Sequence, residues 1–82
     1  MKAQAEWENE VKGMLKAEIK RRNMTYEQLA EKLAEIGVHD SARNIINKIN
    51  RGSFSAVFFV QCLRAIGCGS LSIETIHRPA NL

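Results

Sequence analysis

The sequence feature that most constrains the fold is a set of residues that interrupt the chain between stretches of helical periodicity. Each is an asparagine or a glycine, the residue types that best tolerate the left-handed backbone at a helix C-terminus. They are Asn23, Gly37, Gly52 and Gly67. Between them, apolar residues recur at spacings of three and four, which is the period of an α-helix. The sequence therefore predicts four helices, over about 7–22, 25–36, 41–51 and 56–66.

Three of these helices begin at a polar side chain that can accept a hydrogen bond from a free backbone amide. At the second helix, Thr25 and Gln28 form a capping box, in which each side chain bonds to the backbone of the other residue. The third helix is predicted to begin at Asp40 or Ser41, and Ser55 opens the fourth. These predicted helix starts and the helix stops given above define the same four helices.

The periodicity changes after the fourth helix. Residues 71–75 alternate apolar and polar side chains, which predicts a short C-terminal β-strand, and residues 78–82 read as a tail. The chain has 82 residues, and two separate cores would need on the order of 100 residues each. We therefore expect one all-α domain over 1–82, with its core at about 7–67 and the strand and tail at 70–82.

Composition excludes several classes of function. The longest apolar run, Ala56 to Val60, is too short to span a membrane, and no secretory signal is present at the N-terminus. The two cysteines, Cys62 and Cys68, have neither disulfide-framework nor metal-ligand spacing, so we expect a reduced, cytoplasmic protein without metal or other cofactor. Without a Gly-rich phosphate loop or a nucleophile beside a base, we expect no enzyme and identify no small-molecule site.

The outward side of the third helix carries side chains suited to nucleic acid. Helical spacing places Asn44, Asn47, Lys48 and Arg51 on one stripe, with Arg43 beside it. Asparagine and arginine match the donor and acceptor edges of adenine and guanine in the major groove, and lysine suits phosphate or guanine. A solvated helix face is the alternative, but this stripe has no carboxylate after Asp40. We predict that these five residues read DNA bases.

Three segments resemble the Cro/repressor-type (lambda repressor-like) helix-turn-helix family. Residues 23–33, NMTYEQLAEKL, resemble the second helix of that family, and residues 46–52, INKINRG, resemble the end of its recognition helix. Residues 55–67 are similar to its next helix, with Ala56, Phe59 and Val60 among the core positions. The sequence is also similar to a set of small bacterial domains of uncharacterised function. The resemblance covers roughly residues 11–67 and implies a compact four-helix helix-turn-helix domain, to which the alternation at 71–75 adds the short C-terminal strand.

This resemblance implies a small transcriptional regulator that binds double-stranded DNA sequence-selectively. Four hydroxyl or amide side chains would hold DNA phosphates. Ser53 and Ser55 precede the fourth helix, where free amides and the helix dipole favour an anion. Thr25 and Gln28 are assigned by the resemblance, although helix capping alone also accounts for both.

Two features favour an alternative, a protein-interaction module on the same scaffold without a DNA-binding role. The connection after Gly37 is about three residues longer than the family pattern. In the family register the apolar pair Val57 and Phe58 faces solvent, which is typical of an interface. We expect a homodimer through this pair or through the strand residues Leu71 and Ile73; folding back of the C-terminal segment over the pair is the other reading.

Overall fold

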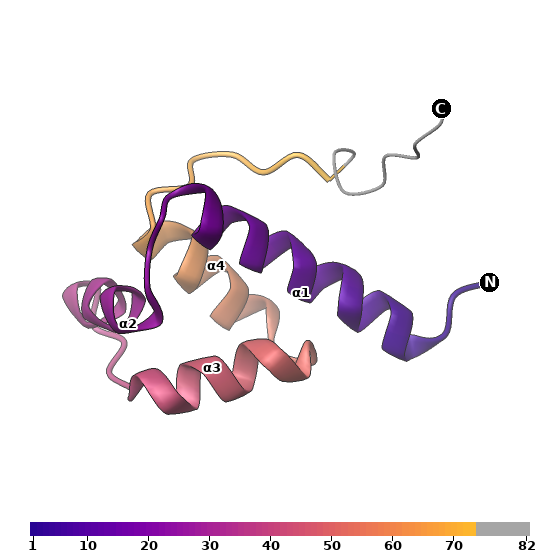
Figure 1. The fold of residues 1–82 in the computed structure, drawn as a ribbon, viewed down its shortest axis with the longest axis horizontal. Coiled ribbons are helices and arrows are strands. Elements are labelled where there is room, and N and C mark those ends of the chain that lie inside the picture. Colours follow the sequence, from indigo (N-terminus) through magenta and orange to yellow (C-terminus); the bar gives the residue numbers. More distant parts are fainter. Residues whose placement is uncertain (74–82) are drawn as a thin grey trace.

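A computed structural model describes residues 1–73 of the chain, which contain four α-helices (Figure 1). The helices are α1 (Gln4–Arg21), α2 (Tyr26–Glu35), α3 (Ala42–Arg51) and α4 (Ala56–Ala65). Both α3 and α4 pack against α1 and against α2. This arrangement confirms the all-helical part of the predicted fold. No helix in this part of the chain is long and apolar enough to cross a membrane.

The predicted starts of the later helices are confirmed. Thr25, Ser41 and Ser55 each accept a hydrogen bond from the backbone amide three residues further on. The first helix differs, because it begins at Gln4 rather than near Trp7. The Glu6 carboxylate accepts a hydrogen bond from the Ala3 amide at 2.8 Å and so satisfies one of the free donors at that end.

The predicted stops are also confirmed, since all four interrupting residues have positive φ. Gly52, which ends α3 at φ +73°, is the most constrained of them. A Cβ atom at this position would lie 2.7 Å from the Glu8 carbonyl oxygen on α1. The end of α3 therefore lies so close to α1 that no side chain fits between them.

The core is formed by side chains from all four helices. Those with no exposed surface are Leu15, Leu29, Leu33, Ile45, Ile49 and Cys62. Around them pack further apolar residues, including Ile19, Phe58 and Ile66. Two of the six fully buried side chains come from α3, so the inward side of that helix is fixed by packing.

The orientation of α4 about its own axis differs from the expectation. Phe58 was expected at the surface but is only 6% exposed, and it packs in the core together with Cys62 and Ile66, one and two turns further on. Conversely, Ala56 and Val60 were expected in the core but are exposed. The buried residues Phe58, Cys62 and Ile66 are four residues apart. Burial of the Phe58 ring removes more apolar surface from water than burial of Ala56 or Val60 would.

The predicted C-terminal strand is not present in residues 71–73, and the rest of it lies outside the described residues. A strand requires a hydrogen-bonded partner strand, and the described part of the chain offers none. Leu71 instead lies near Val60 and Leu63 of α4. Ile73 lies near Trp7 and Met14 of α1, so the segment turns back along α1 (Figure 1).

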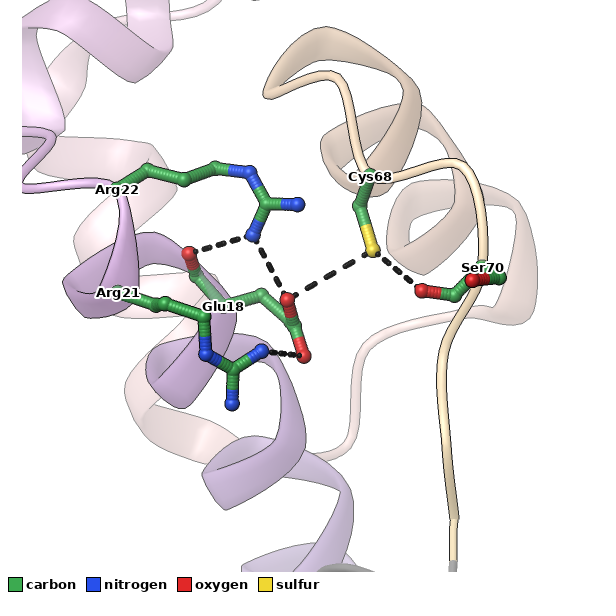
Figure 2. Close-up of polar contacts among 5 residues, drawn as sticks. All are labelled: Glu18, Arg21, Arg22, Cys68 and Ser70. Atoms are coloured by element: carbon green, nitrogen blue, oxygen red, sulfur yellow. Dashed lines mark hydrogen bonds and ion pairs between the residues drawn. The ribbon is translucent and has the colours of Figure 1, made fainter.

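A buried carboxylate joins α1 to the turn after α4 (Figure 2). Glu18 is 8% exposed and accepts hydrogen bonds from Arg21 and Arg22, both at 2.7 Å. The Cys68 thiol lies 3.8 Å from Glu18 Oε1 and 3.1 Å from the Ser70 carbonyl oxygen. The hydrogen bond from Arg22, supported by Arg21 and opposed by burial, holds the pKa of Glu18 below its ordinary value of 4.5.

We predict that Glu18→Gln lowers the free energy of unfolding at pH 7 by about 1–2 kcal/mol, because charge-assisted hydrogen bonds are lost. A lowered folded-state pKa means that the stabilisation is complete above pH 4.5 and is lost as the pH falls through the folded pKa. Urea unfolding should therefore show a smaller difference from the parent at pH 3 than at pH 7. Glu31→Gln, at an exposed position of α2, is the matched control and should change neither value. An equal loss at both pH values would contradict the ionic role.

We also predict that Gly52→Ala is more destabilising than Gly37→Ala. Both positions have positive φ, which costs an L-residue about 1–2 kcal/mol. A Cβ atom at position 37 has nothing within 4 Å, whereas at position 52 it would overlap the Glu8 backbone. We expect a loss of about 1 kcal/mol at position 37 and about 2–4 kcal/mol at position 52, measured by urea unfolding. Equal losses would show that α3 can move away from α1 without cost.

Candidate nucleic-acid interface

The position of α3 is fixed at both of its ends and along one side. Ser41 Oγ accepts a hydrogen bond from the Asn44 amide at 3.1 Å at the start, and Gly52 ends the helix. Ile45 and Ile49 are fully buried. The five predicted base-reading residues lie on the remaining sides and are all exposed: Arg43, Asn44, Asn47, Lys48 and Arg51. The predicted outward stripe is therefore present on the surface.

Two of these five side chains are held by a carboxylate. Asp40 Oδ1 accepts a hydrogen bond from Asn44 Nδ2 at 3.0 Å, and Asp40 Oδ2 pairs with Lys48 Nζ at 3.1 Å. The hydrogen bond from Asn44, followed by those from Lys48 and the Ser41 backbone, keeps the pKa of Asp40 below its ordinary value of 3.8. Lys48 Nζ also lies 5.2 Å from the centre of the Phe58 ring. Asn44 and Lys48 are thus oriented by the protein itself.

The sequence analysis considered Asp40 only as a helix start and missed this role. The signal is the spacing of Asp40, Asn44 and Lys48, which are four residues apart and so lie above one another on a helix. Asp40 precedes α3, and Lys48 lies about two helical turns beyond it, with Asn44 between them.

The other three predicted base-reading residues form a separate row. Arg43, Asn47 and Arg51 are also four residues apart, and within residues 1–73 their side chains have no hydrogen bond or ion pair. Beside this row, the Asn50 carbonyl oxygen accepts a hydrogen bond from Lys12 Nζ at 3.1 Å. This contact adds a lysine of α1 to the basic surface, which the sequence analysis did not foresee. We call Arg43, Asn47 and Arg51 the open row.

A hollow of about 200 Å³ lies where α3 ends and α4 begins. Its lining combines two cations, two hydroxyls and two aromatic rings, from Lys48, Arg51, Ser53, Ser55, Phe54 and Phe58. Ser55 Oγ accepts a hydrogen bond from the Phe58 amide at 3.0 Å, which leaves its hydroxyl proton free to donate. The first amides of α4 also point outward at this end. The predicted phosphate residues Ser53 and Ser55 are therefore brought together with two of the predicted base-reading residues.

The other two predicted phosphate residues lie elsewhere. Thr25 and Gln28 are exposed at the start of α2 and do not line the hollow. Their side chains complete the predicted capping box: Thr25 Oγ1 accepts from the Gln28 amide at 3.1 Å, and Gln28 Oε1 accepts from the Thr25 amide at 2.8 Å. Both oxygens are occupied within the helix start, and only hydroxyl and amide protons remain for an anion.

The four residues predicted for a dimer interface differ in how exposed they are. Val57 and Ile73 are 66% and 61% exposed, and Leu71 is half-buried. Phe58 is the exception, because its ring lies in the core with the Phe54 ring centre 5.6 Å away. Phe58 therefore cannot be part of an exposed pair.

The cysteines and acidic residues form no metal site within residues 1–73, where no three or more His, Cys, Asp or Glu side chains converge. Burial raises the pKa of the Cys62 thiol to about 12. His77 lies outside the described residues.

Comparison with known proteins gives a family but no activity. No curated protein matches this chain, and no solved structure does. A match does exist to a family described as a domain of unknown function (DUF6471). It spans residues 7–71, which include α2, α3, α4 and all of α1 except residues 4–6, together with the whole of the surface described above. The chain therefore belongs to the DUF6471 family.

Proposed function

We propose that this domain binds double-stranded DNA through α3 and the junction between α3 and α4. The observation that carries the proposal is the open row of Arg43, Asn47 and Arg51, exposed along one side of a helix and without partners in the described chain. Unpaired arginine and asparagine side chains present paired donors and acceptors to base edges in the major groove. In this proposal α2 and α3 are the two helices of a helix-turn-helix, as the sequence resemblance implies.

The hollow beside the open row supports a phosphate contact. Lys48 and Arg51 supply positive charge, while Ser53 and Ser55 supply hydroxyl donors at the start of α4. Phosphate contacts fix the position of a protein on DNA, and base contacts select the sequence. One side of the domain therefore carries both kinds of contact. A role as a small transcriptional regulator in the cytoplasm, expected from the sequence, accords with this proposal.

One observation favours the second candidate function, a protein-interaction module. Asp40 places a carboxylate at the start of α3 and pairs with Lys48, which reduces the positive charge offered to a DNA backbone. A carboxylate near a phosphate also repels it. If the physiological partner is DNA, this carboxylate opposes its binding. If the partner is a protein, the carboxylate need not oppose it.

We predict that the parent protein binds mixed-sequence DNA duplexes with an affinity that falls steeply between 50 and 200 mM salt, roughly as expected for phosphate contacts. Fluorescence anisotropy with labelled duplexes would measure this. Because Arg51 also lines the hollow proposed for phosphate, Arg51→Ala should weaken binding to all duplexes and reduce the salt slope by about 1. Asn47→Ala should instead relax the preference at about one base position, with a cost of roughly 1–3 kcal/mol.

The matched control is Lys32→Ala, which removes an exposed positive charge from α2 that is paired with Glu35. It should leave binding unchanged. If the Arg51 and Asn47 variants bind as tightly as the parent, the open row is only a solvated surface. If the parent shows no salt-dependent binding, the DNA proposal is wrong.

We further predict that Asp40→Asn strengthens DNA binding, because it removes a negative charge and releases Lys48 for a phosphate. The expected change is roughly threefold or more in Kd at low salt, with a steeper salt dependence. The same anisotropy titration would measure it, and circular dichroism would confirm unchanged helix content. Weaker binding in a folded variant would show that Asp40 positions Lys48 for the contact rather than competing with it.

A further inference from the structure

A row of three lysines on α1 has no part in the DNA contacts described so far. Lys12, Lys16 and Lys20 are four residues apart, so they lie above one another along one side of the helix. Lys12 is held at 3.1 Å from the Asn50 carbonyl oxygen of α3, whereas Lys16 and Lys20 have no hydrogen bond or ion pair within residues 1–73. Glu8, one turn before Lys12, limits the positive charge toward the N-terminus. We call the three lysines the lysine row.

The last two lysines of the row line a hollow at the start of α2. It has a volume of about 430 Å³. Besides the two lysines, its lining consists of neutral side chains, from Ile19, Asn23, Met24 and Tyr26. Thr25 lies between two of these residues in the chain, and its hydroxyl proton remains available to an anion. Two unpaired ammonium groups therefore lie beside the start of α2, where two of the predicted phosphate residues are.

The neighbouring carboxylates lie away from this hollow. Glu18 is two residues from both Lys16 and Lys20, which places it on nearly the opposite side of α1. Figure 2 shows its carboxylate turned toward Cys68 and held by two arginines. Glu27, in the first turn of α2, does not line the hollow. The positive charge of the lysine row is therefore not neutralised where it meets the start of α2.

The lysine row begins at the edge of the open row. Asn50 lies three residues after Asn47 and seven after Arg43, so it is beside the open row on the surface of α3. The bond from Lys12 to the Asn50 carbonyl oxygen brings α1 to that edge. From its first lysine to its last, the row rises by about 12 Å, roughly the axial length over which one DNA strand carries three or four phosphates. The row thus extends the basic surface of α3 by a length that suits a DNA backbone.

We propose that the lysine row binds phosphates of the DNA duplex that the open row contacts. This inference rests on the proposed function and adds α1 to its contact surface. Lys16 and Lys20 contact phosphates directly. Lys12 keeps its bond to α3 and offers the two other protons of its ammonium group. Contacts of this kind raise the affinity for every sequence and do not select bases.

Salt titrations by fluorescence anisotropy, with the full chain and labelled mixed-sequence duplexes, test the proposal. The double variant Lys16→Gln, Lys20→Gln should bind roughly tenfold more weakly at 50 mM salt, with a salt slope smaller by about 2, because each phosphate contact contributes about 0.9. The double variant Lys16→Arg, Lys20→Arg keeps both charges and should keep the slope of the parent. Circular dichroism would verify that both variants retain the helix content of the parent.

The matched control is Arg64→Gln. Arg64 is an exposed cation of α4 without a partner in the described part of the chain, and it lines a different hollow together with Cys68. Its loss should change the Kd by less than about twofold, since charges beyond the screening length contribute little.

The outcomes separate this inference from the proposed function. If the parent shows a salt slope that Arg51→Ala reduces, but the glutamine variant binds like the parent, DNA binding stands and the lysine row is only a solvated surface. If the arginine variant loses as much as the glutamine variant, α1 acts through packing, and the inference is wrong. If Arg64→Gln weakens binding as much as the glutamine variant does, net charge rather than this row is responsible. A parent without salt-dependent binding overturns the proposed function and this inference together.

Discussion

The close approach of α3 to α1 at Gly52 determines where the candidate binding residues of α3 and of the turn after it lie. Because a Cβ atom there would meet the Glu8 carbonyl oxygen at 2.7 Å, the helix ends against α1 with no room for a side chain between them. The Lys12 contact to the Asn50 carbonyl oxygen lies at the same end and adds a polar link. The turn that follows brings Ser53 and Ser55 beside Lys48 and Arg51. The hollow is thus a consequence of how tightly two helices pack.

The surface of α3 is divided into two rows that behave differently. Asn44 and Lys48 are ordered by Asp40, so a partner that used them would first have to break contacts within the protein. Arg43, Asn47 and Arg51 have no such contacts to break, although long side chains lose rotamer freedom on binding. Because of this division, the number of polar side chains on a helix face is larger than the number that are free to contact a partner. Here three of the five exposed polar side chains are free of contacts within the described chain.

Local features of the fold could be predicted from the sequence, and long-range ones could not. The caps at Thr25, Ser41 and Ser55 depend on hydrogen bonds within four residues, so they can be read directly from the chain. The rotation of α4 could not be read in this way. Its first half is apolar on every side, and only packing against the other helices decides that Phe58 faces inward and Val60 outward. The absent strand at 71–73 has a similar origin, since alternation predicts a strand without supplying its partner.

The candidate site, like the fold, could be predicted from the sequence only in its local features. Helical spacing alone placed the five polar residues of α3 on the surface, but it did not show which of them were already engaged. The pairing of Asp40 with Lys48 spans two helical turns and depends on the exact start of α3. The hollow depends on the angle between consecutive helices, which no local pattern encodes. The buried Glu18, by contrast, has two arginines within four residues, and that signal was open to sequence reasoning.

The path of residues 71–73 has a consequence for how this domain can be joined to other proteins. Ile73 and Trp7 line one groove, so the beginning of α1 and the last described residue lie close together. Domains whose ends meet tolerate insertion into a host loop, because the host chain is hardly separated at the junction. A fluorescent protein or affinity tag joined directly before α1 or directly after residue 73 would stand near this groove. Surface immobilisation through such a tag would obstruct the side formed by α1 and α4.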